Sequence, residues 1–486
     1  MEAERITFDK RRRRTVKEIM TEPPGGGHGM SANFEYKGVW FLPENPGNKI
    51  AGTLRFSPHE GAILELIGSF KGVENMLQLT DHEIILGYCG KMVTLYECRE
   101  IGFNIGTHAV QRSNFRAKAV FLDAHFQKKD DVKFKRIEVH YSHLDEWVHI
   151  TGFEIIRPVD KKGITVNYLL PDSIEMTEFE GWNMSIEIKA EGPRIPLSQR
   201  EVAIKERTFI AIESQEEKSF EENFEMVEKI QNFLSLATMS PVRPEIFYGF
   251  TKACTVTIKD KTIYPAVEAV FRLAFPAETA KPLMPDEMLF NYSDIKEKTS
   301  TVLQNWLQKQ EKLKPIFDLY FSTMYNPHLY LENEFLSIVQ AVESYHRRTM
   351  KNFDLPEDEH KKRIDAILNV TPHGHKEWLD NHLEYSNEPR LRKRLKELFK
   401  EVSDATGKFG KESESLVQKT LDTRNYLTHY DEKLRIKAAM GQELYMLTFH
   451  LKMLLETAFL KELGMDKDTI KTLVERNRVY ERISRV

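Results

Sequence analysis

The feature that most constrains the fold is a change in the spacing of apolar residues along the chain. Between residues 33 and 200, short runs rich in β-branched and aromatic residues alternate with turn-forming stretches, as in Phe34–Phe41, Ile50–Phe56 and Phe134–Tyr141. From residue 329 onward, apolar residues recur every three or four positions. The first pattern is typical of antiparallel strands and the second of amphipathic helices. We therefore expect an α+β multidomain protein.

These patterns divide the 486-residue chain into four segments. We expect a sandwich-like, antiparallel β-rich domain at 33–200, a mixed α/β connecting segment at 201–328 and an all-α helical bundle at 329–486. Residues 1–32 combine the basic run Lys10–Arg14 with a glycine-rich breaker, which is typical of a disordered basic extension. The alternative for this extension is an arm that contacts phosphates.

Composition and charge exclude several classes of protein. The net charge of −4 does not indicate a nucleic-acid-binding protein, so any RNA contact must come from local basic patches. The three cysteines form no C-x-x-C pair, which excludes a disulfide framework and a cysteine-rich zinc site. No apolar run reaches the length of a membrane span, and no apolar core follows the early basic residues as in a secretory signal. We expect a cytoplasmic protein with no membrane partner, no bound metal and no other cofactor.

The stretch Arg424-Asn425-Tyr426-Leu427-Thr428-His429 places an arginine, an amide and an imidazole within six residues. On a helix, Asn425 and His429 share a face because they are four residues apart. Arg424 and His429 are five residues apart, which separates them by about 140° around a regular helix. An unbroken helix therefore cannot direct both side chains at one substrate atom. Either the helix is distorted here, or a second copy of the chain completes the site.

These residue types suit the cleavage of RNA without a metal ion. The guanidinium of Arg424 matches phosphate oxygens, and His429 can transfer protons near neutral pH. Asn425 can form a hydrogen bond with His429 across one turn and fix its tautomer. In such a reaction the 2′-hydroxyl attacks the adjacent phosphate, leaving a 2′,3′-cyclic phosphate and a 5′-hydroxyl.

The R-N-x-x-x-H spacing resembles the signature of HEPN-domain ribonucleases. The similarity continues in Phe335–Arg347 and, in the N-terminal half, in Phe34–Pro43 and Ala51–Phe56. From about residue 33 onward, the chain resembles the ApeA-like family of abortive-infection, anti-phage proteins. This resemblance implies a C-terminal HEPN bundle, a toxin-like endoribonuclease activity on cellular RNA such as tRNA, and a homodimer or higher homo-oligomer formed through the bundle. It also implies that the β-rich half senses a phage-derived trigger or restrains the nuclease.

The resemblance further implies roles for individual residues. In two paired copies, Arg424 would bind the phosphate, His429 would transfer protons and Asn425 would orient His429. Three residues are expected to support this site: Glu343, Tyr430 and Asp431. Glu343 lies on the helix whose family counterpart packs behind the motif helix, so it either holds Arg424 or is a surface acid.

Basic residues on the expected helices form a candidate surface for RNA. Its members are Arg347, Arg348, Lys393 and Arg394. The alternative is a set of solvated helix faces, because acidic residues interleave with the basic ones. The histidines His140, His143 and His149 are close in sequence, but no cysteine or carboxylate spacing supports a metal site, and we expect a polar strand face.

Two other functions are open at this point. One is a catalytically silent HEPN module for dimerisation or RNA binding, with a ligand-sensing β domain. The other is a metal-dependent nuclease, which chelation of metal ions would inhibit.

Overall fold

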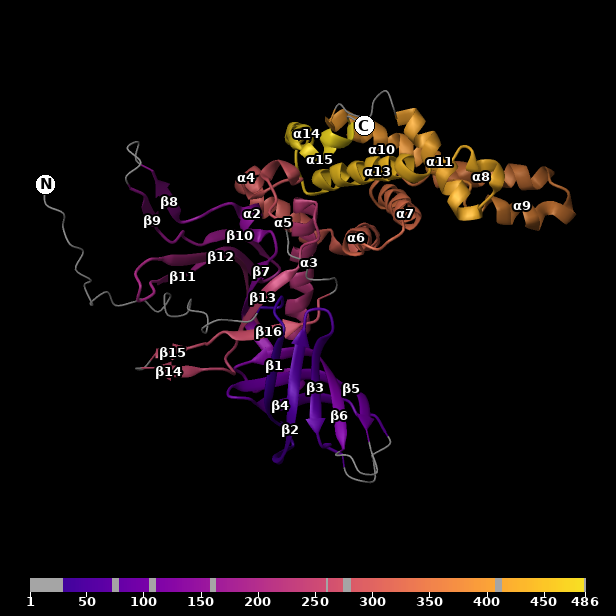
Figure 1. Cartoon of the computed structure of the whole chain (residues 1–486). Helices are drawn as coiled ribbons and strands as arrows, with labels where there is room; N and C mark the ends of the chain where they lie inside the picture. Colours follow the sequence, from indigo (N-terminus) through magenta and orange to yellow (C-terminus); the bar gives the residue numbers. More distant parts are fainter. Residues whose placement is uncertain are drawn as a thin grey trace. The chain divides into compact units, whose positions relative to one another are not determined.

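The computed structural model describes residues 29–71, 78–104, 111–157, 163–258, 261–273, 281–406 and 413–484 (Figure 1). Nearly all of the predicted basic extension, residues 1–28, lies outside this range. The chain forms two compact units. The first comprises Met1–Gln231 and Val242–Pro282, and the second comprises Asn232–Pro241 and Leu283–Val486.

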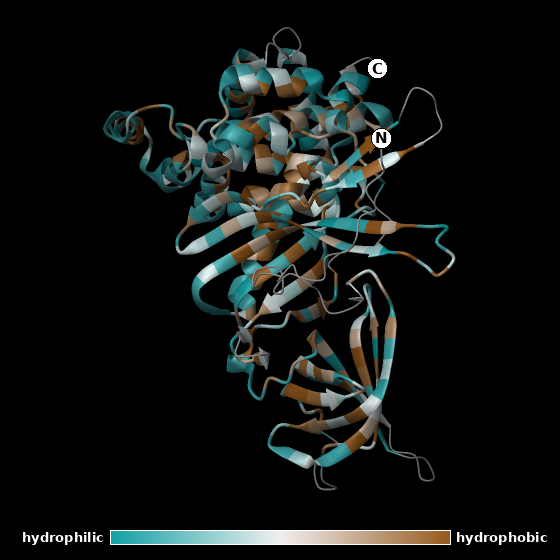
Figure 2. Cartoon of the chain, turned by 90° about the vertical axis from the view of Figure 1, so that its left-hand side faces the viewer, coloured by the Kyte–Doolittle hydropathy of each residue, from teal (hydrophilic) through white to brown (hydrophobic). Residues whose placement is uncertain are grey.

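The first unit contains a closed barrel of antiparallel strands. Its strands are β1 (Phe34–Leu42), β2 (Asn45–Ser57), β3 (Gly61–Ile67), β4 (His82–Tyr88), β5 (Met92–Asn104) and β6 (Arg112–Leu122). They pair in the order β6-β3-β2-β1-β4-β5, and pairing of β5 with β6 closes the ring. Apolar and polar residues alternate along these strands, as Figure 2 shows, because successive side chains point to opposite faces.

The same sheet continues beyond β6 as an open, antiparallel extension in the order β16-β13-β7-β12-β11-β10. These strands are β7 (Lys133–Tyr141), β10 (Ile174–Phe179), β11 (Trp182–Arg194), β12 (Ala203–Ser219), β13 (Pro244–Phe250) and β16 (Val267–Phe271). The unit also contains two small hairpins, β8 (Phe153–Ile156) with β9 (Thr165–Tyr168) and β14 (Val256–Ile258) with β15 (Lys261–Ile263). Its short helical elements are η2 (Lys129–Asp131) and α2 (Leu144–Val148). The antiparallel, β-rich N-terminal fold predicted from sequence is confirmed. In place of the expected sandwich-like arrangement, its strands form a closed barrel that continues as an extended sheet.

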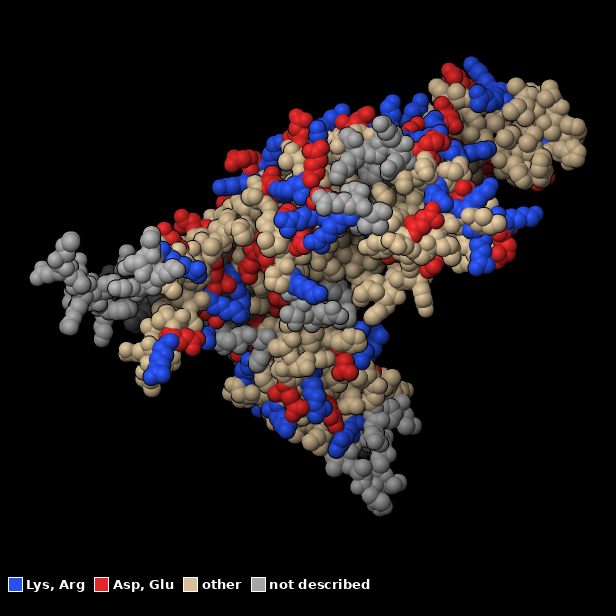
Figure 3. Space-filling view, turned by 45° about the horizontal axis from the view of Figure 1, so that its top comes forward, with Lys and Arg blue, Asp and Glu red and all other residues tan. Residues whose placement is uncertain are grey.

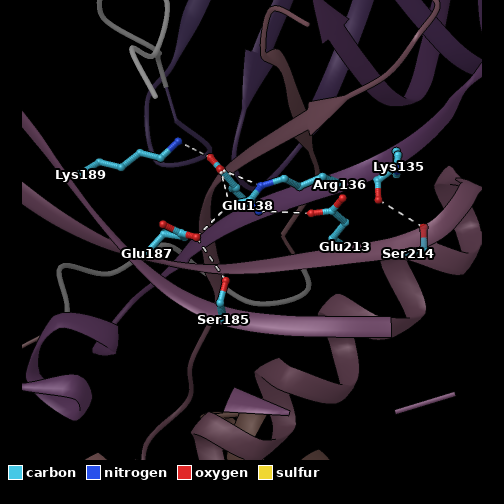
Figure 4. Close-up of polar contacts among 8 residues, drawn as sticks. All are labelled: Lys135, Arg136, Glu138, Ser185, Glu187, Lys189, Glu213 and Ser214. Atoms are coloured by element: carbon cyan, nitrogen blue, oxygen red, sulfur yellow. Dashed lines mark hydrogen bonds and ion pairs between the residues drawn. The ribbon is translucent and has the colours of Figure 1, made fainter. Parts of the chain in front are cut away.

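A network of charged side chains crosses the open sheet (Figure 4). Glu138 on β7 is buried and forms ion pairs with Lys189 on β11 and with Arg136, whose Nη2 lies 3.1 Å from Glu138 Oε1. Arg136 also contacts Glu187 at 3.2 Å and Glu213 at 3.5 Å. Buried charges are stable only when they are paired, so this network holds three neighbouring strands in one register.

The second unit is helical, which confirms the predicted C-terminal fold. Its longer helices are α5 (Thr299–Gln308), α6 (Gln310–Tyr325), α7 (Leu331–Thr349), α8 (Glu357–Val370), α10 (Leu391–Thr406), α11 (Ser413–His429), α13 (Gly441–Glu462) and α14 (Lys467–Arg476). Its shorter elements are η3 (Pro285–Glu287), α4 (Tyr292–Ile295), η4 (Lys296–Lys298), η5 (His373–His375), α9 (Lys376–Leu383), α12 (Glu432–Arg435) and α15 (Arg478–Ser484). Phe335, Val342 and Tyr345 of α7 are buried on one face, as their helical spacing predicts.

Helix α3 (Phe220–Thr238) is common to both units, because the boundary between them falls after Gln231. In the second unit, Asn232 accepts a hydrogen bond from the hydroxyl of Tyr325 at 2.6 Å, and Phe233 packs against Trp306. The end of α3 is therefore anchored among the helices. Of the helices that the structure describes, none has an apolar stretch long enough to cross a bilayer.

Candidate active site

Helix α11 carries the R-N-x-x-x-H motif and is continuous from Ser413 to His429. Residues at helical spacing, including Val417, Thr420 and Leu427, are buried and fix which face of the helix is turned to the core. The helix ends directly after His429 because Tyr430 adopts a left-handed conformation, with φ of 51°. Arg424 and His429 therefore lie on an undistorted helix, about 140° apart around its axis.

Tyr430 and Asp431, predicted to support the site, shape the end of the motif helix. The backbone N–H of Tyr430 donates to the carbonyl of Tyr426 at 2.6 Å, which closes the last turn of α11. The carboxylate of Asp431 accepts a hydrogen bond from the backbone N–H of Lys433 at 3.0 Å and caps α12. These contacts fix the position at which the chain leaves the helix beside His429.

Arg424 is half-buried and donates from Nη1 to Asn425 Oδ1 at 3.2 Å. Within the described part of the chain, no carboxylate lies within ion-pairing distance of its guanidinium. Asn425 therefore contacts Arg424, whereas the sequence suggested that its amide would hold His429. The guanidinium keeps donors free for an anion, since Arg presents five N–H groups.

His429 is exposed at the last position of α11. Its imidazole forms no hydrogen bond with the side chains or backbone of residues that the structure describes. Both ring nitrogens are thus open to a ligand. One copy of the chain offers an exposed imidazole and a half-buried guanidinium on different sides of the same helix.

Glu343 on α7 is half-buried and forms no ion pair with Arg424 in the described structure. Its charge acts instead on Arg394 of α10, whose pKa is lowered mainly by burial while Glu343 opposes that effect. Glu343 is therefore associated with a different arginine from the one expected.

Arg394 was expected on an RNA-binding surface, and this expectation is wrong, because its side chain is only 1% exposed. Its Nη1 lies 3.1 Å from His346 Nδ1, and its Nη2 lies 3.2 Å from Glu388 Oε2. A guanidinium can only donate, so Nδ1 must be the acceptor and the His346 Nε2–H donates to Glu397 at 2.7 Å. Burial is the main cause that lowers the pKa of His346, in agreement with a neutral imidazole.

The other three members of the predicted RNA surface are exposed. Arg347 pairs with Glu388 at 2.8 Å, Lys393 pairs with Asp354 at 2.6 Å, and Arg348 donates to a backbone carbonyl. Basic and acidic side chains also interleave on the face seen in Figure 3. An RNA backbone would have to compete with these carboxylates, so the cations form at most a weakly basic surface.

The histidines considered as metal ligands do not form a metal site in the described structure. No group of three or more His, Cys, Asp or Glu side chains there converges as metal ligands would. Nδ1 of His140 lies 2.8 Å from the carbonyl of Thr208, so this buried ring is satisfied by the backbone of β12.

Exposed apolar side chains lie close to the motif in the chain, a feature that the sequence analysis missed. They are Tyr430 (66% exposed), Ile436 (92%), Met440 (43%) and Tyr445 (53%). Their signal in the sequence is weak, because apolar residues are ordinary in a helical bundle and only the fold shows that these four are not buried. Exposed apolar side chains mark a partner surface where they form one contiguous patch.

Two models of known protein families match the chain. Residues 35–306 match the family model described as ApeA N-terminal domain 1, and residues 336–469 match the one described as Apea-like HEPN. The helical unit with its R-N-x-x-x-H motif is thus of the HEPN class. The N-terminal match alone spans more than half of the sequence, and the chain belongs to the ApeA family. Proteins of the ApeA family are, at the family level, HEPN nucleases of anti-phage defence. A comparison with curated proteins and one with solved structures each found no match.

Proposed function

We propose that this protein is a metal-independent endoribonuclease of abortive infection, with an active site built from two copies of the chain. The observation that carries the proposal is the continuity of α11 through the motif. Because the helix is continuous, Arg424 and His429 of one copy point about 140° apart around its axis. This divergence supports a site in which a guanidinium from one copy meets an imidazole from the other. In the described structure Arg424 has no carboxylate partner and contacts only the Asn425 amide, and His429 forms no hydrogen bond, which supports their availability to RNA.

The roles follow from the chemistry of each group. The Arg424 guanidinium binds the non-bridging oxygens of the scissile phosphate and stabilises the negative charge of the transition state. The 2′-oxygen forms a bond to phosphorus as the bond from phosphorus to the 5′-oxygen breaks. His429 accepts the proton of the 2′-hydroxyl and delivers it to the leaving 5′-oxygen. Asn425 positions the Arg424 guanidinium through the contact of 3.2 Å.

The second copy would bind through the exposed apolar residues near the motif. Tyr430 directly follows His429, and the stretch after it contains the other three: Ile436, Met440 and Tyr445. Burying these four side chains in a homodimer would remove apolar surface from water and bring two motif helices together. The substrate would be a cellular RNA such as tRNA, and the β-rich half would respond to a phage-derived trigger.

The experiment is incubation of the purified protein with RNA in excess EDTA, followed by analysis of the RNA ends. The proposal predicts cleavage that leaves 2′,3′-cyclic phosphate and 5′-hydroxyl ends. Arg424→Ala and His429→Ala should each abolish this cleavage. Arg478→Ala is the matched control, because Arg478 is an exposed arginine of helix α15, outside the 430–445 stretch proposed for the dimer contact, and its replacement should leave the rate unchanged.

Three results would contradict the proposal. Tight RNA binding without cleavage would favour a silent RNA-binding module. Loss of cleavage in EDTA would favour a metal-dependent nuclease. Cleavage that survives both alanine substitutions would remove the motif from the mechanism.

A further inference from the structure

A cavity of about 750 Å³ lies in the first unit, where the barrel meets the first turns of α3. Three phenylalanines line it: Phe220 and Phe224 of α3, and Phe271 of β16. Phe220 and Phe271 are buried, whereas Phe224 is half-buried and packs edge-on against Phe271, with ring centroids 5.0 Å apart. The size is that of a small-molecule site, and the aromatic wall suits a flat ring.

Arginines line the cavity in an arrangement that the fold itself does not require. Arg99 on β5 and Arg116 on β6 are direct cross-strand partners, and both are exposed. Two like charges directly opposite each other destabilise a sheet. On the same two strands, the neighbouring Glu97 and Lys118 form an ordinary ion pair of 2.8 Å. The arginine pair therefore destabilises this part of the sheet, and the described structure shows no contact that offsets the repulsion.

The cations of this pair are poorly compensated within the structure. The closest carboxylate to Arg99 is Asp81, at 3.8 Å and itself exposed. Arg116, and also Arg272 at the end of β16, form no ion pair with the described residues. Three guanidinium groups thus line one cavity with at most one weak partner, which favours an anionic ligand.

The carboxylates of the cavity narrow the class of ligand. Glu60, Asp81 and Glu83 also line it, together with the ion pair of Glu97 and Lys118, and these carboxylates would repel a compact polyanion. Carboxylates instead accept hydrogen bonds from hydroxyl and amino groups. A ligand that fits must combine one anionic group, several hydrogen-bond donors and a flat ring. We propose that this cavity binds a nucleoside monophosphate, with its phosphate on the arginines and its base against Phe224.

The cavity is lined by a helix that continues beyond the first unit. Phe220 and Phe224 belong to the first turns of α3, the helix that continues past Gln231 into the helical unit. A nucleotide at this cavity would therefore contact a helix that belongs to both units. This inference concerns the β-rich half and is independent of the nuclease proposed above.

Titration calorimetry of the full chain with AMP tests the proposal, with adenosine and inorganic phosphate as separate probes. We expect saturable AMP binding, and weaker binding of each fragment. Arg116→Ala should weaken AMP binding by about tenfold or more, which is the usual scale for one charge-assisted contact. Phe224→Ala should also weaken it. Arg112→Ala is the matched control, because Arg112 lies on the same strand, is exposed, and pairs with Glu65 outside the cavity lining.

Several outcomes would overturn the proposal. They are an absence of saturable AMP binding to the wild-type chain, unchanged affinity in Arg116→Ala, or equal loss in Arg112→Ala. Phosphate that binds as tightly as AMP would refute the role of Phe224 and hence a nucleotide as the ligand. Arg116 is exposed, so its replacement leaves the fold intact, and a circular dichroism spectrum of each variant confirms this.

Discussion

Arg394 and Lys393 are neighbours on α10 with the same charge, yet the structure predicts very different losses of stability when each is replaced. Arg394→Met removes the donor to His346 Nδ1 at 3.1 Å and to Glu388 at 3.2 Å, and leaves a buried imidazole nitrogen unpaired. Removing one partner of a buried charged network costs about 3–5 kcal/mol. Glu388 is partly exposed, so we expect the lower end, about 3 kcal/mol. Lys393→Met breaks only exposed pairs, with an expected cost of about 0–1 kcal/mol.

The assay is urea unfolding of the full chain followed by far-UV circular dichroism, which reports mainly on the helices. The midpoint for Arg394→Met should fall well below that of the wild type, while the midpoint for Lys393→Met should stay close to it. Equal midpoints for the two variants would refute the buried network. A fall for Lys393→Met alone would contradict the burial of Arg394 and the exposure of Lys393.

Three further predictions concern other parts of the chain. Burial lowers the pKa of His346, so the unfolded chain binds more protons than the folded chain below about pH 6.5. The free energy of unfolding should therefore decrease as the pH falls from 7 toward 5. The urea midpoint of His346→Gln should lose part of this pH dependence. Glu138→Leu should destabilise the sheet by about 3–5 kcal/mol by leaving buried Lys189 without its carboxylate; thermal unfolding of the variant at the wild-type temperature would contradict this. If the exposed apolar residues bind a second copy, Ile436→Asp should convert a dimer into a monomer in sedimentation experiments, and a dimer that persists would exclude this surface.

Local periodicity predicted the types of structure well. The buried stripe of α7, including Phe335, Val342 and Tyr345, follows from residues spaced three and four apart. The alternation of apolar and polar residues along β1 and β2 likewise predicted strands. It shows only on which face of the sheet each residue lies. The closure of the barrel depends on pairing between β5 and β6 and on which edges meet, and no local pattern encodes that long-range choice.

The RNA surface was predicted from positive charge alone, and this placed Arg394 on it incorrectly. Arg394 lies one turn before Leu398 on α10 and so falls on the apolar side of that helix, a clue that its positive charge obscured. The motif itself was recognisable, but its contacts were not. Spacing allowed Asn425 to reach His429, whereas in the structure its amide accepts from the adjacent Arg424. Rotamers and neighbouring helices decide such pairings, and the sequence does not specify them.

The most direct test of the composite site is a mixed dimer. Arg424→Ala and His429→Ala chains carrying different tags are expressed together, and dimers containing one of each are isolated and assayed on RNA in EDTA. Such a dimer retains one intact guanidinium and one intact imidazole on different chains, so it should recover roughly half of the wild-type rate, while either variant alone stays inactive. A mixed dimer without activity would show that Arg424 and His429 must act from the same chain, and would contradict the account.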